Sequence, residues 1–217
     1  MSPPRRVLLL AAAVTTAAVA VTGCSIGDDG PRTSATRDVP AFTRIDNADS
    51  VDVRVHVGEP QRVRVRAGEK VIDDIRTSVR DGTLHISFDH HGLGDPDPVV
   101  EATVPRLSGI DASGSGDVSA DGIDVDAFGV RSDGSDGISL KGTAGSLRVD
   151  MDGSGDANLG DLSARVAKVA VGGSGDADVR ADDRLDVSVD GSGDVEYHGD
   201  PSLTKHLDGS GDLSQGD

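Results

Sequence analysis

The second half of the chain is filled by a repeat, and the central part of one unit reads Val187-Ser188-Val189-Asp190-Gly191-Ser192-Gly193-Asp194-Val195-Glu196-Tyr197. Its phrase Gly-Ser-Gly-Asp returns at residues 114–117, 153–156, 173–176 and 209–212, and a degenerate copy, Gly134-Ser135-Asp136-Gly137, fills the one gap. The first glycines of successive copies are 20, 19, 20, 18 and 18 residues apart. A nearly fixed period in this range predicts a solenoid, in which each repeat forms one rung of a stack.

The residues on both sides of the phrase alternate between apolar and polar. Four positions before it stand Val149, Val169 and Val187, and polar residues such as Arg148 and Ser188 stand beside them. Alternation with period two indicates a strand with one buried face. Two short strands and two turns in each repeat cannot fold alone, so each strand must pair with its equivalent one rung away. We therefore predict an all-β fold, a right-handed parallel β-helix with rungs of about 18–20 residues.

The glycines of the phrase are expected to make the sharp turn between strands. Such turns often need a positive φ, which glycine adopts without steric cost. The Ser and Asp side chains of the phrase can accept hydrogen bonds from nearby turn amides.

Residues 39–105 are predicted to form strands joined by turns. Asp81-Gly82 is a hairpin signal between two alternating segments. Phe42-Thr43-Arg44-Ile45 followed by Ala48-Asp49-Ser50-Val51 reads as a worn first copy of the rung. We expect this half to have the longer strands and to open or cap the helix, because bare strand edges invite aggregation. Residues 39–217 are then a single β-helical head domain.

The N-terminus carries a processing signal, residues 1–23. A basic pair, Arg5 and Arg6, precedes an apolar stretch at residues 7–21 that is short for a spanning helix. Val21-Thr22-Gly23-Cys24 resembles the lipobox of bacterial lipoproteins. The resemblance implies cleavage after Gly23 and a lipid on Cys24. Residues 24–38 are predicted to be a flexible tether, because the segment is polar, contains Gly, Pro, Ser and Thr, and lacks periodicity. An ordinary secretory signal is the alternative, and the export route, general secretory or twin-arginine, stays open.

Charge and aromatic content exclude several classes of binding partner. The formal net charge is −17 and the pI is about 4.5. Nucleic acid is excluded as a partner, because its affinity depends on basic residues that neutralise phosphate. Direct binding to an anionic lipid surface is disfavoured for the same reason. Only 2% of residues are aromatic and Tyr197 is the only tyrosine, so a groove that stacks sugars is not expected.

A column of carboxylates follows from the repeat. The aspartates that close the phrase are Asp117, Asp156, Asp176, Asp194 and Asp212, and a second set precedes it at Asp133, Asp152, Asp190 and Asp208. Stacked rungs would place equivalent aspartates about 4.8 Å apart. Ca²⁺ could bridge them, since it takes several oxygen ligands in flexible geometry. We favour the alternative, aspartates that are solvated or bonded to turn amides, and predict no cofactor.

No catalytic constellation stands out. His85, His90 and His91 lie near Asp89 and could ligate Zn²⁺, but a loop of solvated histidines is the favoured interpretation. Gly-x-Ser-x-Gly elbows are absent from the sequence. The chain is therefore predicted not to be an enzyme.

The order of these segments resembles one family. The residues that carry it are Phe42-x-x-Ile45, Val79-Arg80-Asp81-Gly82-Thr83-Leu84-His85-Ile86, Val104-Pro105-Arg106-Leu107-Ser108-Gly109-Ile110 and Ser113-Gly114-Ser115-Gly116-Asp117-Val118. They are similar to the auto-transporter adhesin head domain, also called the GIN domain and formerly a domain of unknown function, over about residues 40–215. The resemblance implies a β-helical fold, an extracytoplasmic location and adhesion, and it brings no catalytic residues. The chain departs from it at Ala48-Asp49-Ser50, where the family tends to have the glycine motif.

The sequence thus predicts a lipid-anchored adhesion or binding module on the extracytoplasmic face of the cell membrane. Its expected partners are the membrane, through the lipid on Cys24, and a surface protein or glycan that the sequence does not name. A structural envelope protein with Ca²⁺-stabilised rungs is the alternative, and a carbohydrate-active enzyme is the second alternative.

Overall fold

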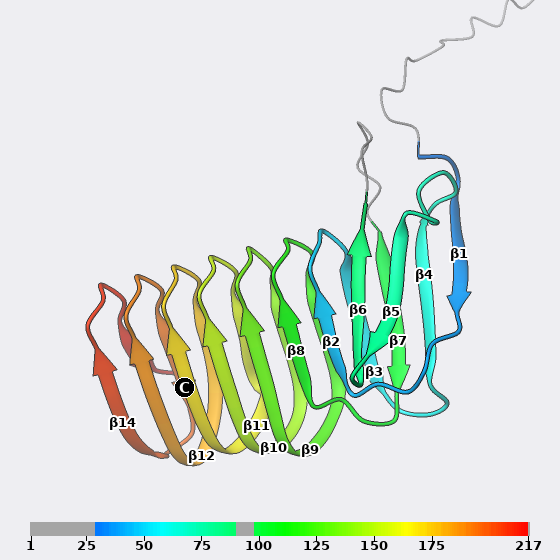
Figure 1. The fold of residues 1–217 in the computed structure, drawn as a ribbon. Coiled ribbons are helices and arrows are strands. Elements are labelled where there is room, and N and C mark those ends of the chain that lie inside the picture. Colours follow the sequence, from blue (N-terminus) through cyan, green and yellow to red (C-terminus); the bar gives the residue numbers. More distant parts are fainter. Residues whose placement is uncertain (1–28, 90–97, 217) are drawn as a thin grey trace, which may run out of the picture.

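The structure, a computed structural model, describes residues 29–89 and 98–216 and is built from strands and turns. The strands are β1 (Arg32–Arg37), β2 (Arg44–Asn47), β3 (Asp52–Val57), β4 (Arg62–Gly68), β5 (Ile75–Arg80), β6 (Thr83–Phe88), β7 (Val99–Val104), β8 (Gly109–Ala112), β9 (Val118–Ser132), β10 (Ile138–Met151), β11 (Ala157–Val171), β12 (Ala177–Val189), β13 (Val195–His198), β14 (Ser202–Leu207) and β15 (Leu213–Gln215). Figure 1 shows them wound into rungs that stack side by side, from β14 at one end to β1 at the other. The prediction of a β-solenoid is confirmed.

Two walls face each other across the core. The first wall contains β3, the N-terminal parts of β9–β12, β13 and β15; the second contains β2, β8, the C-terminal parts of β9–β12, and β14. Neighbouring strands within these sets are parallel and pair one rung away. Val149 lies opposite Val130 on one side and Val169 on the other, and Val169 lies opposite Val187. All four valines are buried, so the register predicted from the alternation is confirmed.

The worn first rung also takes its predicted place. β2 pairs in parallel with β8, and β3 with β9, so residues 44–57 form a rung directly beside the first complete one. Their connecting turn stacks on the first Gly-Ser-Gly-Asp turn, and Ser50 Oγ lies 2.8 Å from Ser115 Oγ.

A further rung has no glycine phrase. β6 pairs in parallel with β2, and β7 pairs in parallel with β3. β6 and β7 therefore form a rung beside the one that contains β2 and β3.

Antiparallel strands close this end of the stack. β4 pairs with β7, β1 pairs with β4, and β5 pairs with β6. The predicted hairpin at Asp81-Gly82 joins β5 to β6, with φ of 50° and 72° at its two residues. β1 lies at the outer edge (Figure 1). We call this end the capped end.

Two expectations need correction. The prediction of a flexible tether over residues 24–38 is wrong for Arg32–Arg37, because these residues form β1. This polar segment buries little apolar surface, and its backbone hydrogen bonds to the edge strand β4 hold it as a strand. The longer strands also lie in the second half of the chain. β9–β12 have 13 to 15 residues, because each continues through the bend that joins the two walls, whereas β2–β8 have four to seven.

The other end of the stack is open. Within the described residues β14 pairs with β12 alone, and β15 pairs with β13 alone. Every residue of β14 is exposed, including Leu203 and Leu207. No helix with the length and apolar character to cross a membrane occurs in residues 29–89 and 98–216.

Candidate functional site

The aspartate column is held by backbone amides. Asp176 Oδ1 accepts a hydrogen bond from the N–H of Asp194 at 2.7 Å, and Asp194 Oδ1 accepts one from the N–H of Asp212 at 2.8 Å. The same link joins Asp156 to the N–H of Asp176 at 3.0 Å. Each carboxylate therefore fixes the turn of the next rung, and one of its two oxygens already has a partner.

The column begins in the worn first rung. Asp52 Oδ1 accepts from the N–H of Asp117 at 3.1 Å, and Asp117 Oδ1 accepts from the N–H of Gly137 at 3.0 Å. All five aspartates that were named as Ca²⁺ candidates thus take part in this ladder, as acceptors, through their amides, or both. This geometry favours the amide-bonded interpretation of the repeat.

The glycines serve a different purpose from the one predicted. Among the described residues none of the Gly-Ser-Gly-Asp glycines has a left-handed φ. Instead, a Cβ at Gly173 would collide with the carbonyl oxygen of Gly153, and one at Gly191 with that of Gly173. Those carbonyls accept hydrogen bonds from Ser174 and Ser192, at 2.9 and 2.8 Å. Glycine is needed because successive turns are hydrogen-bonded at close range.

The degenerate copy buries a carboxyl group. Asp136 replaces the second glycine of the phrase and is 1% exposed. Ser132 Oγ donates to Asp136 Oδ1 at 3.2 Å, whereas Asp136 Oδ2 has no partner. Burial raises the pKa of Asp136 above its ordinary value of 3.8.

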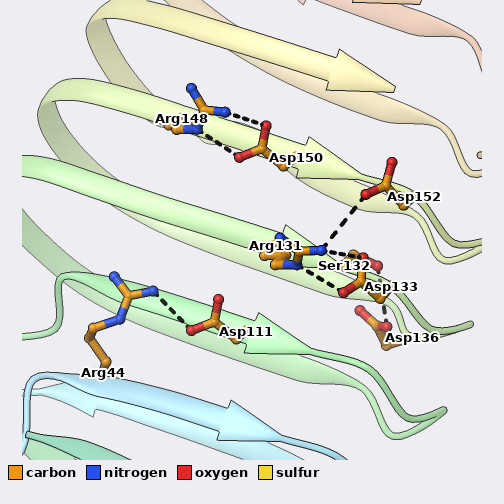
Figure 2. A network of polar contacts seen from close by, with 9 residues as sticks. All are labelled: Arg44, Asp111, Arg131, Ser132, Asp133, Asp136, Arg148, Asp150 and Asp152. Carbon is orange, nitrogen blue, oxygen red and sulfur yellow. Dashed lines mark hydrogen bonds and ion pairs between the residues drawn. The ribbon is translucent and has the colours of Figure 1, made fainter. Parts of the chain in front are cut away.

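The outward face of the second wall carries charge pairs, shown in Figure 2. Arg148 Nε lies 2.7 Å from Asp150 Oδ2, and Arg131 Nε lies 2.8 Å from Asp133 Oδ2. Residues two apart on a strand share a face, so each strand neutralises its own arginine. The hydrogen bond and charge of Asp133 raise the pKa of Arg131 above its ordinary value. Both arginines therefore have a carboxylate partner close to them in the sequence.

Two hollows on the outward face of the first wall differ in charge. One has a volume of about 390 Å³ and is acidic; its lining residues include Asp156, Asp176, Asp178, Asp194 and Glu196. The other has a volume of about 430 Å³ and holds most of its charge as arginine; its lining residues include Arg54, Arg62, Arg64 and Glu101. The first follows from the predicted column. The second was missed, because its arginines lie on β3 and β4, which are separated in the sheet by β7, a strand from later in the sequence.

The structure describes only one of the three histidines of the zinc hypothesis. His85 Nδ1 lies 2.7 Å from Asp46 Oδ2, while His90 and His91 lie outside the described residues. A triplet that the sequence did not single out, Asp190, His206 and Asp208, brings three potential ligand atoms within 4.8 Å of one another. All three side chains are exposed, and His206 Nε2 already lies 2.9 Å from Asp208 Oδ2.

The predicted lipid site lies outside the described residues. Val21, Thr22, Gly23 and Cys24 all belong to residues 1–28, so lipid attachment stays a prediction.

Comparison with known proteins identifies the fold and the family. A putative adhesin from Bacteroides fragilis NCTC 9343 is 21% identical, with a TM-score of 0.72 over 85% of this chain and 97% of that chain. A putative lipid binding protein from Parabacteroides distasonis ATCC 8503 is 20% identical, with a TM-score of 0.57 over 88% of this chain and 98% of that chain. These similarities concern the fold. No curated protein matches the chain.

One family model matches residues 41–201, a range that includes the first rungs and every copy of the glycine phrase except the last, at residues 209–212. The resemblance deduced from the glycine phrase and the Asp-Gly-Thr-Leu strand is therefore confirmed. The chain belongs to the family described as putative auto-transporter adhesin, head GIN domain.

Proposed function

We propose that this protein is a lipid-anchored adhesion or binding head, held on the extracytoplasmic face of the cell membrane by Cys24 and without catalytic activity. The family description supports the adhesion part of the proposal. The partner is a surface protein or glycan. Nucleic acid does not fit a chain with a formal net charge of −17.

The observation that carries the proposal is the position of β1. It begins at Arg32, eight residues after Cys24, and lies at the outer edge of the capped end. Eight residues span at most about 29 Å, at roughly 3.6 Å per residue. A lipid on Cys24 would therefore hold the capped end near the membrane, and the stack would extend outward from it.

The charge of the head suits this arrangement. A strongly negative head is repelled by anionic lipid and stays soluble. The lipid on Cys24 then supplies the attachment that the head's own surface does not. Both walls stay available to a partner, since the membrane faces the end of the stack rather than its sides.

Cell adhesion tests this proposal. Cells that carry the native chain and cells that carry Cys24→Ala are compared for attachment, under flow, to surfaces coated with envelope glycan or envelope protein. We expect native cells to attach to at least one coat, and Cys24→Ala cells to lose attachment although they produce the head in equal amount. Equal attachment of the two strains contradicts the proposal.

A further inference from the structure

The hollow of about 430 Å³ on the first wall collects arginines from two strands that a third separates. Arg62 and Arg64 are alternate residues of β4, so both point to the outward face, and Arg54 does so from β3. β7 lies between β4 and β3 and contributes Glu101. We call this feature the arginine hollow.

Register explains why the arginines converge. Arg64 lies opposite Glu101 across one strand pair, and Arg54 lies opposite Glu101 across the next. Neighbouring strands are about 4.8 Å apart, so the three side chains form one row across the sheet. Long guanidinium side chains on both sides of one strand can reach the same bound group.

The carboxylates nearby do not neutralise this row. Glu101 Oε1 accepts a hydrogen bond from a fourth arginine, Arg66, at 2.8 Å. Among the described residues, the nearest carboxylate oxygen to Arg54 belongs to Asp52 and is 3.9 Å away. Among the residues that the structure describes, Arg62 and Arg64 have no carboxylate oxygen within 4 Å, in contrast to Arg131 and Arg148 on the second wall.

The other acidic residue of the hollow is also engaged. Asp121 Oδ1 lies 2.6 Å from His56 Nδ1. Three arginines and two carboxylates line the hollow, so with His56 neutral it has a small excess of positive charge on a chain with a net charge of −17. Its volume falls within the range of small-ligand sites, about 300–1,000 Å³.

We propose that the arginine hollow binds an oxyanion, a carboxylate or a phosphate group carried by a small ligand or by one residue of an acidic glycan, with Arg54, Arg62 and Arg64 as donors. The planar guanidinium fork matches both groups and can bind either in a bidentate manner. The strong negative charge elsewhere on the head disfavours long polyanions, so a single acidic group is the unit recognised. This inference rests on the proposed binding function and names its ligand class.

Calorimetric titration of the purified full-length protein in detergent tests the site, with inorganic phosphate and trigalacturonate as probes. One probe carries phosphate and the other carboxylate, so the pair separates the two sources of the oxyanion. We expect saturable binding of at least one probe, at least tenfold weaker in Arg62→Gln/Arg64→Gln. The matched control is Arg148→Gln, which removes an arginine from the second wall and is expected to bind as the native protein does.

Thermal melting checks that the variants are folded. If the double variant melts early, Arg54→Gln gives the same test from another strand, with binding expected to weaken severalfold. Failure of both probes to saturate, equal affinity in the native and arginine-hollow variants, or an equal loss in Arg148→Gln would overturn the proposal. The adhesion test is separate. Failure of native cells to attach to any coat, with saturable probe binding by the native protein, counts against the proposed function alone. Attachment of native cells, with no saturable binding of either probe by the native protein, counts against this site alone.

Discussion

Asp176 and Asp194, equivalent residues of neighbouring rungs, are joined by a hydrogen bond of 2.7 Å from the amide of Asp194 to Oδ1 of Asp176. The bond makes the aspartate a part of the turn rather than a free ligand. Asp176→Ala should remove it and lower the free energy of unfolding by about 1 kcal/mol. Asp176→Asn keeps an acceptor oxygen and should change stability little. Chemical denaturation of the two variants measures the difference.

The same residue separates amide bonding from Ca²⁺ binding. A cation that binds the folded state raises its stability in proportion to RT ln(1 + [L]/Kd), whereas screening depends on ionic strength alone. We expect CaCl2 and NaCl at matched ionic strength to give equal melting temperatures. A Ca²⁺-specific rise of several degrees that disappears in Asp176→Asn would show that the column binds cations.

The buried valine column should not tolerate charge. Val169 is fully buried between Val149 and Val187. Val169→Asp would place an unpaired carboxylate in the core and should cost several kcal/mol of stability. Lys168→Ala, one position away on the exposed face, is the control and should change the melting temperature little. Similar losses in the two variants would mean that the register is wrong.

Substitution by alanine should cost less at a glycine with a left-handed φ than at a glycine packed against the backbone of a neighbouring rung. Gly82 has a left-handed φ of 72°, and a Cβ there would meet nothing within 4 Å. Gly82→Ala should therefore cost about 1 kcal/mol, the strain of the backbone alone. Gly173→Ala should cost more, because its Cβ collides with the backbone of the preceding rung. A smaller loss in Gly173→Ala than in Gly82→Ala, measured by denaturant unfolding, would contradict the close-approach explanation.

Asp136 should make stability depend on pH. Its pKa is raised in the folded state, so its contribution is fully favourable below the unfolded value of about 3.8 and is lost as pH rises through the folded value. Asp136→Asn should accordingly be more stable than the native protein at pH 7, on the order of 1 kcal/mol, and equal to it near pH 3. Asp212→Asn, at an exposed position, is the control. An Asp136→Asn gain that persists at low pH would show that burial of charge is not its cause.

The sequence was most informative where it repeats. The alternation around Val149, Val169 and Val187 determines which face of each strand is buried. The spacing of the glycine phrase determines which residues stack, because equivalent segments of successive repeats pair in parallel. The rung made of β6 and β7 has no glycine phrase, so its membership became visible only through its pairing with β2 and β3.

Features that depend on pairing between segments far apart in the chain could not be predicted from the sequence. Arg32–Arg37 has no apolar alternation, and only its edge pairing with β4 makes it a strand. The arginine hollow requires β7 to lie between β3 and β4, an order that differs from the order in the chain. The alternating arginines of β4 were the one signal of it, since they place charge on a single face of a strand in an otherwise acidic protein.

Thiol labelling of intact cells tests the anchored, outward-facing arrangement most directly. Cys24 is the only cysteine, and a lipid on it would consume its thiol. Thr204 is exposed on β14, at the end of the stack opposite β1. With a membrane-impermeant maleimide, we predict no label on the native chain and strong label on Thr204→Cys before lysis. Label on the native chain, or label on Thr204→Cys only after lysis, would contradict the account.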